Sequence, residues 1–274
     1  MNAPPPLKPA TDDAIVQRDD REGIAFVVLN RPQARNALSA AMLEALSRTL
    51  AAIASDKLIR AVVFAANGPA YCAGHDLREI TERRKDPDGG LAYTKALMDS
   101  CSAMMMSIHR MPQPVIAAIE GPASAAGCQL VATCDLAIAS HAASFATPGV
   151  HIGLFCSTPM VALSRNVAPK HAMEMLLTGE PVSADEAYRI GLVNRVVAHG
   201  MAREEAFKLA RRIAAKSALT IKLGKEAFFR QRDMTLPEAY RYTSQVMVEN
   251  MMARDAKEGI SAFVEKRAPN WEDR

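Results

Sequence analysis

The 274-residue chain is long enough for one large domain or a core with an appendage, and its hydrophobic residues, 49% of the total, can form a sizeable core. No apolar run reaches about 18 residues, and no basic cluster is interleaved with aromatic residues, so we expect neither a membrane nor a nucleic acid as partner. The net charge of +3 reflects an excess of Lys and Arg beyond residue 200, which fits either a solvated helical face or a surface that meets an anionic cofactor.

The first residues and the cysteines suggest where the protein works. Residues 1–13 are rich in proline, lack an apolar segment and carry one lysine, so we expect a flexible leader and not a signal or transit peptide. The five cysteines include no Cys-x-x-Cys pair. This pattern favours reduced thiols in a cytoplasmic protein and argues against a zinc site, so no metal is expected.

Strand and helix patterns alternate through the first 200 residues. Hydrophobic periodicity predicts a helix that begins after Ser39 and another over residues 91–110, with apolar residues at three- and four-residue steps. The other predicted elements are a hairpin of residues 14–18 and 23–29 turning at 19–23, strands 60–66, 114–119 and 135–140, a polar stretch over 81–90, and a helix around Gly127.

The second part of the chain changes character. Ser183 and Glu186 have the spacing of a capping box that opens a helix. Beyond residues 193–197 the pattern becomes purely helical, over 202–215, 218–231, 236–253 and 256–266. Strand-strand-helix units that recur about every 50 residues predict an α/β fold, a ββα superhelix over residues 14–200. A helical region over 201–274 follows, in which Met247, Met251, Met252 and Phe263 require a partner surface.

Two small-residue turns follow buried strand patterns and precede helices. The first is Ala-Gly-His-Asp at residues 73–76, and the second is the segment 121–129, Gly-Pro-Ala-Ser-Ala-Ala-Gly-Cys-Gln. Such turns present free backbone N–H groups, so two of them can hold one carbonyl oxygen as an oxyanion hole. The alternative is that the small residues serve only close strand–helix packing. A nucleotide phosphate loop is excluded, because no Lys-Ser/Thr follows the second turn.

These turns resemble those of the crotonase superfamily, the enoyl-CoA hydratase/isomerase family. Other motifs match in order and spacing: Leu-Asn-Arg-Pro at 29–32, Asn-Ala-Leu at 36–38, Cys-Asp-Leu-Ala-Ile-Ala at 134–139, Thr-Gly-Glu-Pro-Val-Ser-Ala at 178–184 and the segment 257–267. The resemblance implies a crotonase-like ββα core and C-terminal helices that assemble a homotrimer, usually paired into a hexamer. It also implies an acyl-CoA thioester substrate, with coenzyme A as part of the substrate and no permanently bound cofactor.

The same resemblance assigns roles to individual residues. The oxyanion donors would be the backbone amides of His75 and Ala126. The two catalytic glutamates of the family's hydratases fall at Gln129 and Gly149, and a third position that is aspartate in some isomerases is Ser157. Gln129 can orient a water but cannot accept its proton, and Gly149 has no side chain, so we expect weak hydration at best. Glu79 and Glu120, which flank the two turns, are the nearest spare carboxylates; Glu120 is expected to face solvent.

Substrate-binding residues are also implied by the resemblance. The loop of residues 31–36 and the first turn are expected to line pantetheine and adenine. Arg35, and Lys266 of a neighbouring subunit, are expected to face phosphates, and Phe263 to close the acyl pocket. The complete set is Ala34, Arg35, Ala73, Gly74, Asp76, Leu77, Gly127, Cys156, Ser157, Phe263 and Lys266.

Two side-chain hypotheses remain open. The His75 ring either takes part in chemistry, as in a methylmalonyl-CoA decarboxylase of the family that shares the Ala-Gly-His-Asp turn, or turns aside while its amide donates. Cys156 and Ser157 with His151 nearby suggest a nucleophile and base, or simply polar residues that line a pocket. The sequence therefore favours an acyl-CoA enzyme, a lyase of hydratase/isomerase type in fatty-acid metabolism. The alternatives are an acyl-CoA decarboxylase and a non-catalytic acyl-CoA-binding or scaffold protein.

Overall fold

The computed structural model describes residues 14–274, so the leader expected at residues 1–13 lies outside the described chain. Its centre is a six-stranded sheet in the order β1-β2-β3-β4-β6-β9. Within this sheet β1 and β2 pair antiparallel, and each later neighbour is parallel, which requires a crossover connection between strands. The strands are β1 Val16–Arg21, β2 Ile24–Leu29, β3 Ala61–Ala66, β4 Val115–Ile119, β6 Leu136–Ser140 and β9 Arg195–Val197.

A second, three-stranded sheet collects the short strands that follow β4, β6 and α6. Its order is β5-β7-β8, with β5 Ala123–Ser124, β7 Ser144–Ala146 and β8 Val182–Ser183. The chain thus passes from the large sheet to the small sheet and then into a helix, which is the expected ββα unit. The mixed α/β fold is confirmed.

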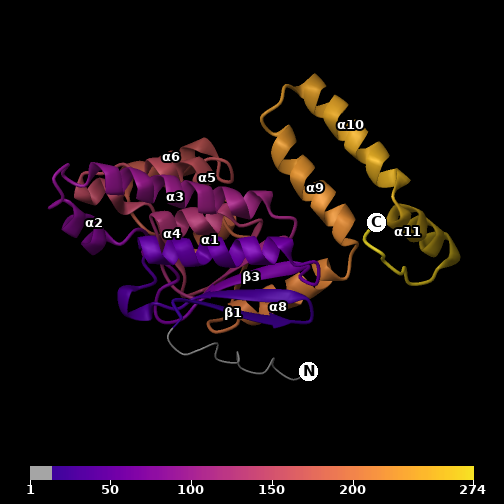
Figure 1. Ribbon diagram of the computed structural model, residues 1–274, viewed down its shortest axis with the longest axis horizontal. Coiled ribbons are helices and arrows are strands. Elements are labelled where there is room, and N and C mark those ends of the chain that lie inside the picture. The colour runs from indigo at the N-terminus through magenta and orange to yellow at the C-terminus, as the bar shows by residue number, and fades with distance from the viewer. Residues whose placement is uncertain (1–13) are drawn as a thin grey trace.

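Helices cover one face of the large sheet in Figure 1, where α1, α3 and α4 lie above the strands. The main hydrophobic core lies on this face, between strand residues such as Val27 and Phe64 and helix residues such as Leu46 and Met104. The helices of this part are α1 Ala40–Ser55, α2 Leu77–Arg83, α3 Leu91–Arg110, α4 Ala126–Thr133, α5 Ser157–Leu163, α6 Pro169–Thr178 and α7 Ala184–Arg189, with short 3-10 turns η1 Pro32–Ala34 and η2 Pro148–Ile152.

The opposite face of the sheet is covered by α8, Ala202–Ala214. Its residues Ala206, Phe207 and Ala210 form a second core with Phe26 and Val63 of the strands. The sequence analysis placed the boundary between core and helical tail near residue 200. This boundary assigns α8 to the tail, although α8 packs on the sheet. The helices α9 Ala218–Gln231, α10 Leu236–Met252 and α11 Arg254–Glu265 extend away from the core in Figure 1.

Helices α10 and α11 expose the apolar residues that were expected to pack against a partner surface. Met247, Met251, Met252 and Phe263 are all exposed in the single chain. Exposed apolar side chains of this size are typical of interaction surfaces. The trimer or hexamer stays a prediction. No helix within residues 14–274 has the length and apolar character needed to cross a membrane.

Local differences from the expected elements have clear causes. Strand β1 runs to Arg21 instead of residue 18, because Arg18 pairs with Asp20 and Arg21 with Asp19 along this edge strand. The hairpin turn shrinks to Glu22 and Gly23, which both have positive φ. Helix α2 extends into the expected polar stretch, because the Asp76 carboxylate caps it.

The capping box at Ser183 is only half formed. Ser183 Oγ accepts a hydrogen bond from the Glu186 N–H at 3.1 Å. The Glu186 carboxylate, however, binds Arg189 at 2.6 and 2.7 Å and does not return to the Ser183 N–H. Glu186 binds the Arg189 guanidinium in place of the Ser183 N–H, because charge-assisted hydrogen bonds are stronger than those to a neutral backbone donor.

Candidate functional site

The first turn lies between two neighbouring segments of chain. On one side the Leu38 N–H donates to the Gly74 carbonyl at 2.7 Å, and the Asp76 N–H donates to the Leu38 carbonyl at 3.3 Å. On the other side the Ser124 N–H donates to the Cys72 carbonyl at 2.8 Å. Because alternate peptide groups of an extended segment point to opposite sides, the N–H of His75 points away from Leu38.

The two amides expected to form an oxyanion hole are unused. Neither the N–H of His75 nor that of Ala126 donates a hydrogen bond to another group within residues 14–274. Ala126 is the first residue of α4, so its N–H has no intrahelical acceptor and lies at the positive end of the helix dipole. Both groups are therefore free to bind an oxygen from outside the chain.

Close packing brings these amides to one place. Gly74 has φ +94°, and a β-carbon there would lie 2.9 Å from the Ala125 β-carbon and 3.3 Å from the Ala126 nitrogen. Ala125 itself has φ 49° and ψ −117°, an unfavourable backbone conformation that costs roughly 1–3 kcal/mol and is typical of functional sites. Its N–H is held by the Ala146 carbonyl at 2.9 Å. This strained residue sets the direction of the Ala126 N–H that follows it.

Gly127 makes the second close approach. A β-carbon on Gly127 would stand only 2.1 Å from the Cys72 carbonyl oxygen. Any larger residue would push α4 away from the first turn. Gly127 therefore serves close packing between α4 and the first turn, and the same packing brings the Ala126 amide close to that turn.

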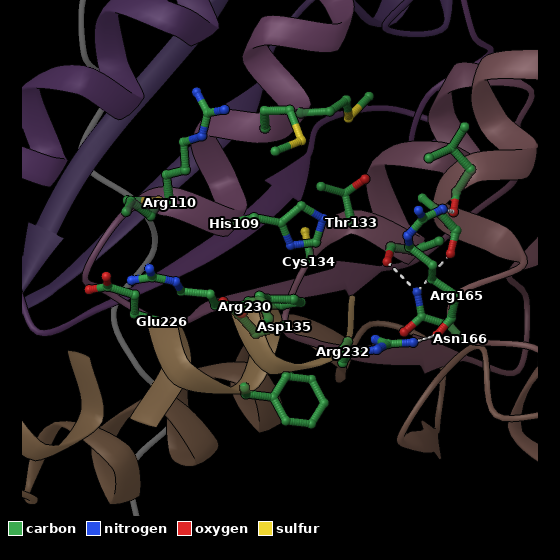
Figure 2. A pocket seen from close by; sticks show the side chains of 18 of the residues that line it. His109, Arg110, Thr133, Cys134, Asp135, Arg165, Asn166, Glu226, Arg230 and Arg232 are labelled. Atoms are coloured by element: carbon green, nitrogen blue, oxygen red, sulfur yellow. Dashed lines mark hydrogen bonds between the residues drawn. The ribbon is translucent and has the colours of Figure 1, made fainter. Parts of the chain in front are cut away.

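Gln129 connects the turns to a large cavity. Its side chain is buried, and its Oε1 has no hydrogen-bond partner within the described chain. The residue also lines a cavity of about 890 Å³ between α3, α4, α5 and α9, shown in Figure 2. The site thus has two parts: the amides at the start of α4, and a cavity along the remainder of that helix.

Gly149 lies where a loop closes tightly on itself. The Leu154 N–H donates to the Gly149 carbonyl at 2.9 Å. A β-carbon on Gly149 would lie 2.8 Å from the Leu154 carbonyl oxygen and 3.0 Å from the Cys156 sulfur. The space that a longer side chain needs at this position is filled by the protein's own backbone.

Comparison with known proteins agrees with this geometry. The family model described as enoyl-CoA hydratase/isomerase matches residues 19–274. The chain belongs to the enoyl-CoA hydratase/isomerase family. It is 44% identical over 266 residues to the rat protein named enoyl-CoA hydratase domain-containing protein 3, mitochondrial, with 97% of this chain and 87% of the relative covered.

Solved structures of the family have the same fold. The enoyl-CoA hydratase of Mycobacterium smegmatis superposes with a TM-score of 0.90 at 49% identity, covering 94% of this chain and 99% of that one. The human enoyl-CoA hydratase domain-containing protein 3 gives 0.89 at 45% identity, covering 94% and 100%. The rat relative's name places that protein in mitochondria, so the cytoplasmic location expected for this chain stays a prediction.

The His75 ring has no partner in this family member. Both ring nitrogens are buried and lack a hydrogen bond within the described chain. Burial lowers the pKa of the imidazole, and the nearby Leu38 carbonyl offsets only part of that lowering. The ring is therefore neutral at pH 7, with one donor and one acceptor left for a ligand.

The carboxylates nearest the turns are all occupied. Glu79 accepts from the Ala40 N–H at 3.1 Å, at the start of α1. The expectation that Glu120 faces solvent is wrong: its carboxylate accepts from the N–H groups of Gly200 and Ala202 at 2.8 and 2.7 Å, because the start of α8 lies above this strand end. Asp76 pairs with Arg31 at 2.7 Å while it caps α2.

The structure does not support the hypothesis that Cys156 or Ser157 is a nucleophile with His151 as its base. The His151 ring lies against Gly179, whose β-carbon would be 2.9 Å from His151 Nε2. Ser157 Oγ donates to the Phe155 carbonyl at 3.3 Å, and burial raises the pKa of the Cys156 thiol. The alternative, polar residues that line a pocket, is not supported either, because His151 and Ser157 are exposed and none of the three residues lines the cavity of about 890 Å³.

The expected coenzyme-binding residues fall into two groups. Ala34 and Arg35 lie beside the first turn, where the Ala73 N–H donates to the Arg35 carbonyl at 3.0 Å, and the exposed Leu77 follows at the start of α2. Phe263 belongs to α11 and Lys266 follows the end of this helix, which lies far from α2 and α4 in Figure 1, and Phe263 is 85% exposed. A single chain does not bring them to the turns, so a role for them from a neighbouring subunit stays a prediction.

Apart from Gln129, the cavity residues were not identified as site residues from the sequence. They come from helices far apart in the chain, and include His109 of α3, Arg165 after α5, and Arg230 and Arg232 at the end of α9. A histidine on an otherwise apolar helix face was the one available signal. Within residues 14–274 no three His, Cys, Asp or Glu side chains are grouped to hold a metal ion.

Proposed function

We propose that this protein is an acyl-CoA thioester enzyme that stabilises an enolate with the backbone amides of His75 and Ala126. The observation that carries the proposal is that both N–H groups are unused while the chain packs them together at Gly74. An oxyanion donor of this kind typically contributes roughly 3–4 kcal/mol of transition-state stabilisation. Coenzyme A enters as part of the substrate, along Arg35 and the first turn.

Fast hydration is not part of the proposal. Water addition needs a base for the water and an acid for the alpha carbon. Gln129 supplies neither, and the backbone of Leu154 fills the space at Gly149. With Asp76, Glu79 and Glu120 engaged elsewhere, the site favours reactions that need enolate stabilisation without a strong base, such as decarboxylation.

A silent acyl-CoA-binding protein is the second candidate, because the carboxylates described beside the turns, Asp76, Glu79 and Glu120, are all engaged in other contacts. The unpartnered, neutral His75 ring supports the catalytic candidate, because a buried polar group without a partner is costly unless a ligand uses it.

A binding experiment tests the amide pair directly. An acyl-CoA thioester and the S-alkyl-CoA thioether of equal length differ at the carbonyl oxygen. We expect the thioester to bind about tenfold tighter by calorimetry. Equal affinities would refute the proposed site.

A turnover experiment then separates the two candidates. Crotonyl-, malonyl- and methylmalonyl-CoA are incubated with the protein and followed by mass spectrometry. Loss of carbon dioxide from malonyl-CoA or methylmalonyl-CoA supports the enzyme, and binding of all three without any conversion supports the silent protein. Rapid hydration of crotonyl-CoA would contradict the importance of the missing acids.

A further inference from the structure

Asn36 is a fully buried polar residue to which the proposed function assigns no role. It is 0% exposed, and it opens the Asn-Ala-Leu motif at residues 36–38, which contacts the first turn. Its backbone has φ 54°, in the left-handed region that asparagine adopts more readily than most residues. Because the side chain is enclosed by the protein, any effect on a substrate must pass through other residues.

The Asn36 side chain joins three backbone groups of two loops. Its Oδ1 accepts a hydrogen bond from the Arg31 N–H at 2.8 Å, which closes the loop of residues 31–36 on itself. Its Nδ2 donates to the carbonyls of Asn67 and Ala70, both at 2.9 Å. Both amide hydrogens and the amide oxygen are therefore engaged, and the loop of residues 31–36 is tied to the segment that follows β3.

The chain on either side of Asn36 holds the first turn. The Arg35 carbonyl accepts from the Ala73 N–H at 3.0 Å, and the Leu38 N–H donates to the Gly74 carbonyl at 2.7 Å. The residue before Asn36 and the residue two positions after it thus each bind one residue of the turn. A change in the conformation of this loop would move both contacts.

The Leu38 contact fixes the direction of the free His75 amide. The Gly74 carbonyl and the His75 N–H belong to the same peptide group, and the two point in opposite directions across a planar trans peptide. When Leu38 binds the Gly74 carbonyl, the plane of this peptide is set, and the His75 N–H points away from Leu38. The direction of a proposed oxyanion donor is therefore determined by a residue two positions from Asn36.

Arg31 connects the same loop to the end of the first turn. Its backbone N–H is the group that Asn36 accepts from, and its guanidinium binds the Asp76 carboxylate at 2.7 Å. The turn is thus fastened to this loop at Ala73, Gly74 and Asp76. All three contacts depend on a loop whose conformation the Asn36 side chain maintains.

We propose that Asn36 is a positioning residue of the oxyanion hole, whose three hydrogen bonds hold residues 31–38 so that the His75 N–H is aimed at the thioester oxygen. The inference rests on the proposed thioester function and adds a residue that acts on the amide without touching the substrate. Such donors must be held to within about 0.5 Å of their productive position, which requires a supporting layer of satisfied hydrogen bonds. A residue that only stabilised the fold would affect all ligands equally.

Hexanoyl-CoA and S-hexyl-CoA separate these two roles, because only the thioester has a carbonyl oxygen. Asn36→Gly removes the three hydrogen bonds, and glycine accepts the positive φ. We expect calorimetry to show that the wild type prefers the thioester about tenfold and that the variant prefers it about threefold or less, since the Ala126 amide remains. The affinity for S-hexyl-CoA should stay within about twofold.

A spectroscopic measurement reports on the carbonyl group itself. The ¹³C resonance of hexanoyl-CoA labelled at the thioester carbon should move downfield on binding to the wild type, because hydrogen bonds to the oxygen withdraw electron density from the carbon. In Asn36→Gly this downfield movement should be smaller. Protein stability alone does not change this signal in the bound state.

Gln113→Ala is the matched control. Gln113 is also buried, and its Nε2 donates to the carbonyls of Ile53 and Asp56 at 2.9 and 3.3 Å. Gln113 precedes the start of β4, whereas the second turn follows the end of that strand. The control should lower protein stability but keep the thioester preference and the ¹³C shift of the wild type.

Each other outcome has a definite meaning. An unchanged preference and an unchanged ¹³C shift in Asn36→Gly overturn the positioning role and leave the thioester function standing. An equal loss of affinity for both ligands also overturns it, because Asn36 then serves only the fold. If Asn36→Gly does not fold, the same measurements on Asn36→Asp decide, because aspartate keeps the acceptor for Arg31 and loses the two donated hydrogen bonds. Equal affinities of the wild type for the two ligands refute the amide pair, and the inference with it.

Discussion

A β-carbon on Gly74 would stand 3.3 Å from the backbone nitrogen of Ala126, so the first turn rests directly against the start of α4. The same β-carbon would be 3.1 Å from the Ser124 carbonyl oxygen. Two segments about fifty residues apart in sequence thus share one small space. The separation of the two free amides depends on the absence of a side chain at Gly74.

Replacement of Gly74 by alanine should therefore damage the site. The positive φ and the contact with the second turn both oppose a β-carbon, and we expect a loss of roughly 1–3 kcal/mol in unfolding free energy. Thioester affinity should fall at least about tenfold by calorimetry. Gly89→Ala is the matched control, because Gly89 also has positive φ but a β-carbon there meets nothing within 4 Å. Equal effects of the two substitutions on affinity would show that packing at Gly74 does not position the amides.

Restoring acids at the two glutamate positions should succeed at only one of them. Gln129→Glu fits the existing space, and burial should raise the pKa of the new acid so that it can donate a proton. Gly149→Glu must displace the Leu154 carbonyl and should lower protein stability instead. We expect slow crotonyl-CoA hydration to appear in Gln129→Glu, followed by loss of the enoyl absorbance, and no further gain in the double variant. A large gain in hydration rate from Gly149→Glu alone would contradict the conclusion that the Leu154 backbone fills the space at this position.

His75 should make the fold sensitive to mild acid. Burial holds the pKa of the folded ring below its ordinary value, near 6.5, which the unfolded chain retains. Below that pH the unfolded chain binds a proton that the folded chain does not, so the unfolding free energy falls with decreasing pH. Urea denaturation at pH 7.5 and 5.5 should show a smaller decrease in His75→Phe than in the wild type. An identical pH dependence would mean that the folded ring binds its proton normally.

Lys225 should be essential for holding α9 against the core. Its ammonium group is buried and donates to the Ile108 and Gln113 carbonyls at 2.8 and 2.9 Å as well as to Asp135. Burial lowers the pKa of Lys225, and Asp135 offsets part of the lowering. Lys225→Met leaves the Asp135 charge uncompensated and should cost about 3–5 kcal/mol in urea denaturation.

The control for this prediction is an exposed ion pair of the same type. Lys95 binds Asp99 at 2.7 Å on the surface of α3. Exposed pairs contribute little, so Lys95→Met should leave the unfolding free energy unchanged within error. If the two lysine variants were equally stable, the buried contacts of Lys225 would not anchor α9.

Much of the fold could be predicted because its signals are local. Ser39 caps α1 as expected, and the apolar steps from Met42 to Ile53 are all buried. The boundaries of α8 to α11 differ from the predicted ones by at most two residues at either end. Errors arose where a distant segment supplied the partner, as when the start of α8 took the Glu120 carboxylate.

The features of the site also divide into those that the local sequence determines and those that depend on distant segments. The sequence by itself determined that Gly74 and Gly127 have no side chain. It also determined that Gln129 and Gly149 stand where the family's hydratases have catalytic glutamates. Tertiary structure alone decided that the His75 and Ala126 amides are unused, that Leu154 fills the space at Gly149, and that Arg165, Arg230 and His109 line one cavity. The physical reason is that hydrogen-bond satisfaction and excluded volume depend on atoms far apart along the chain, which no local pattern specifies.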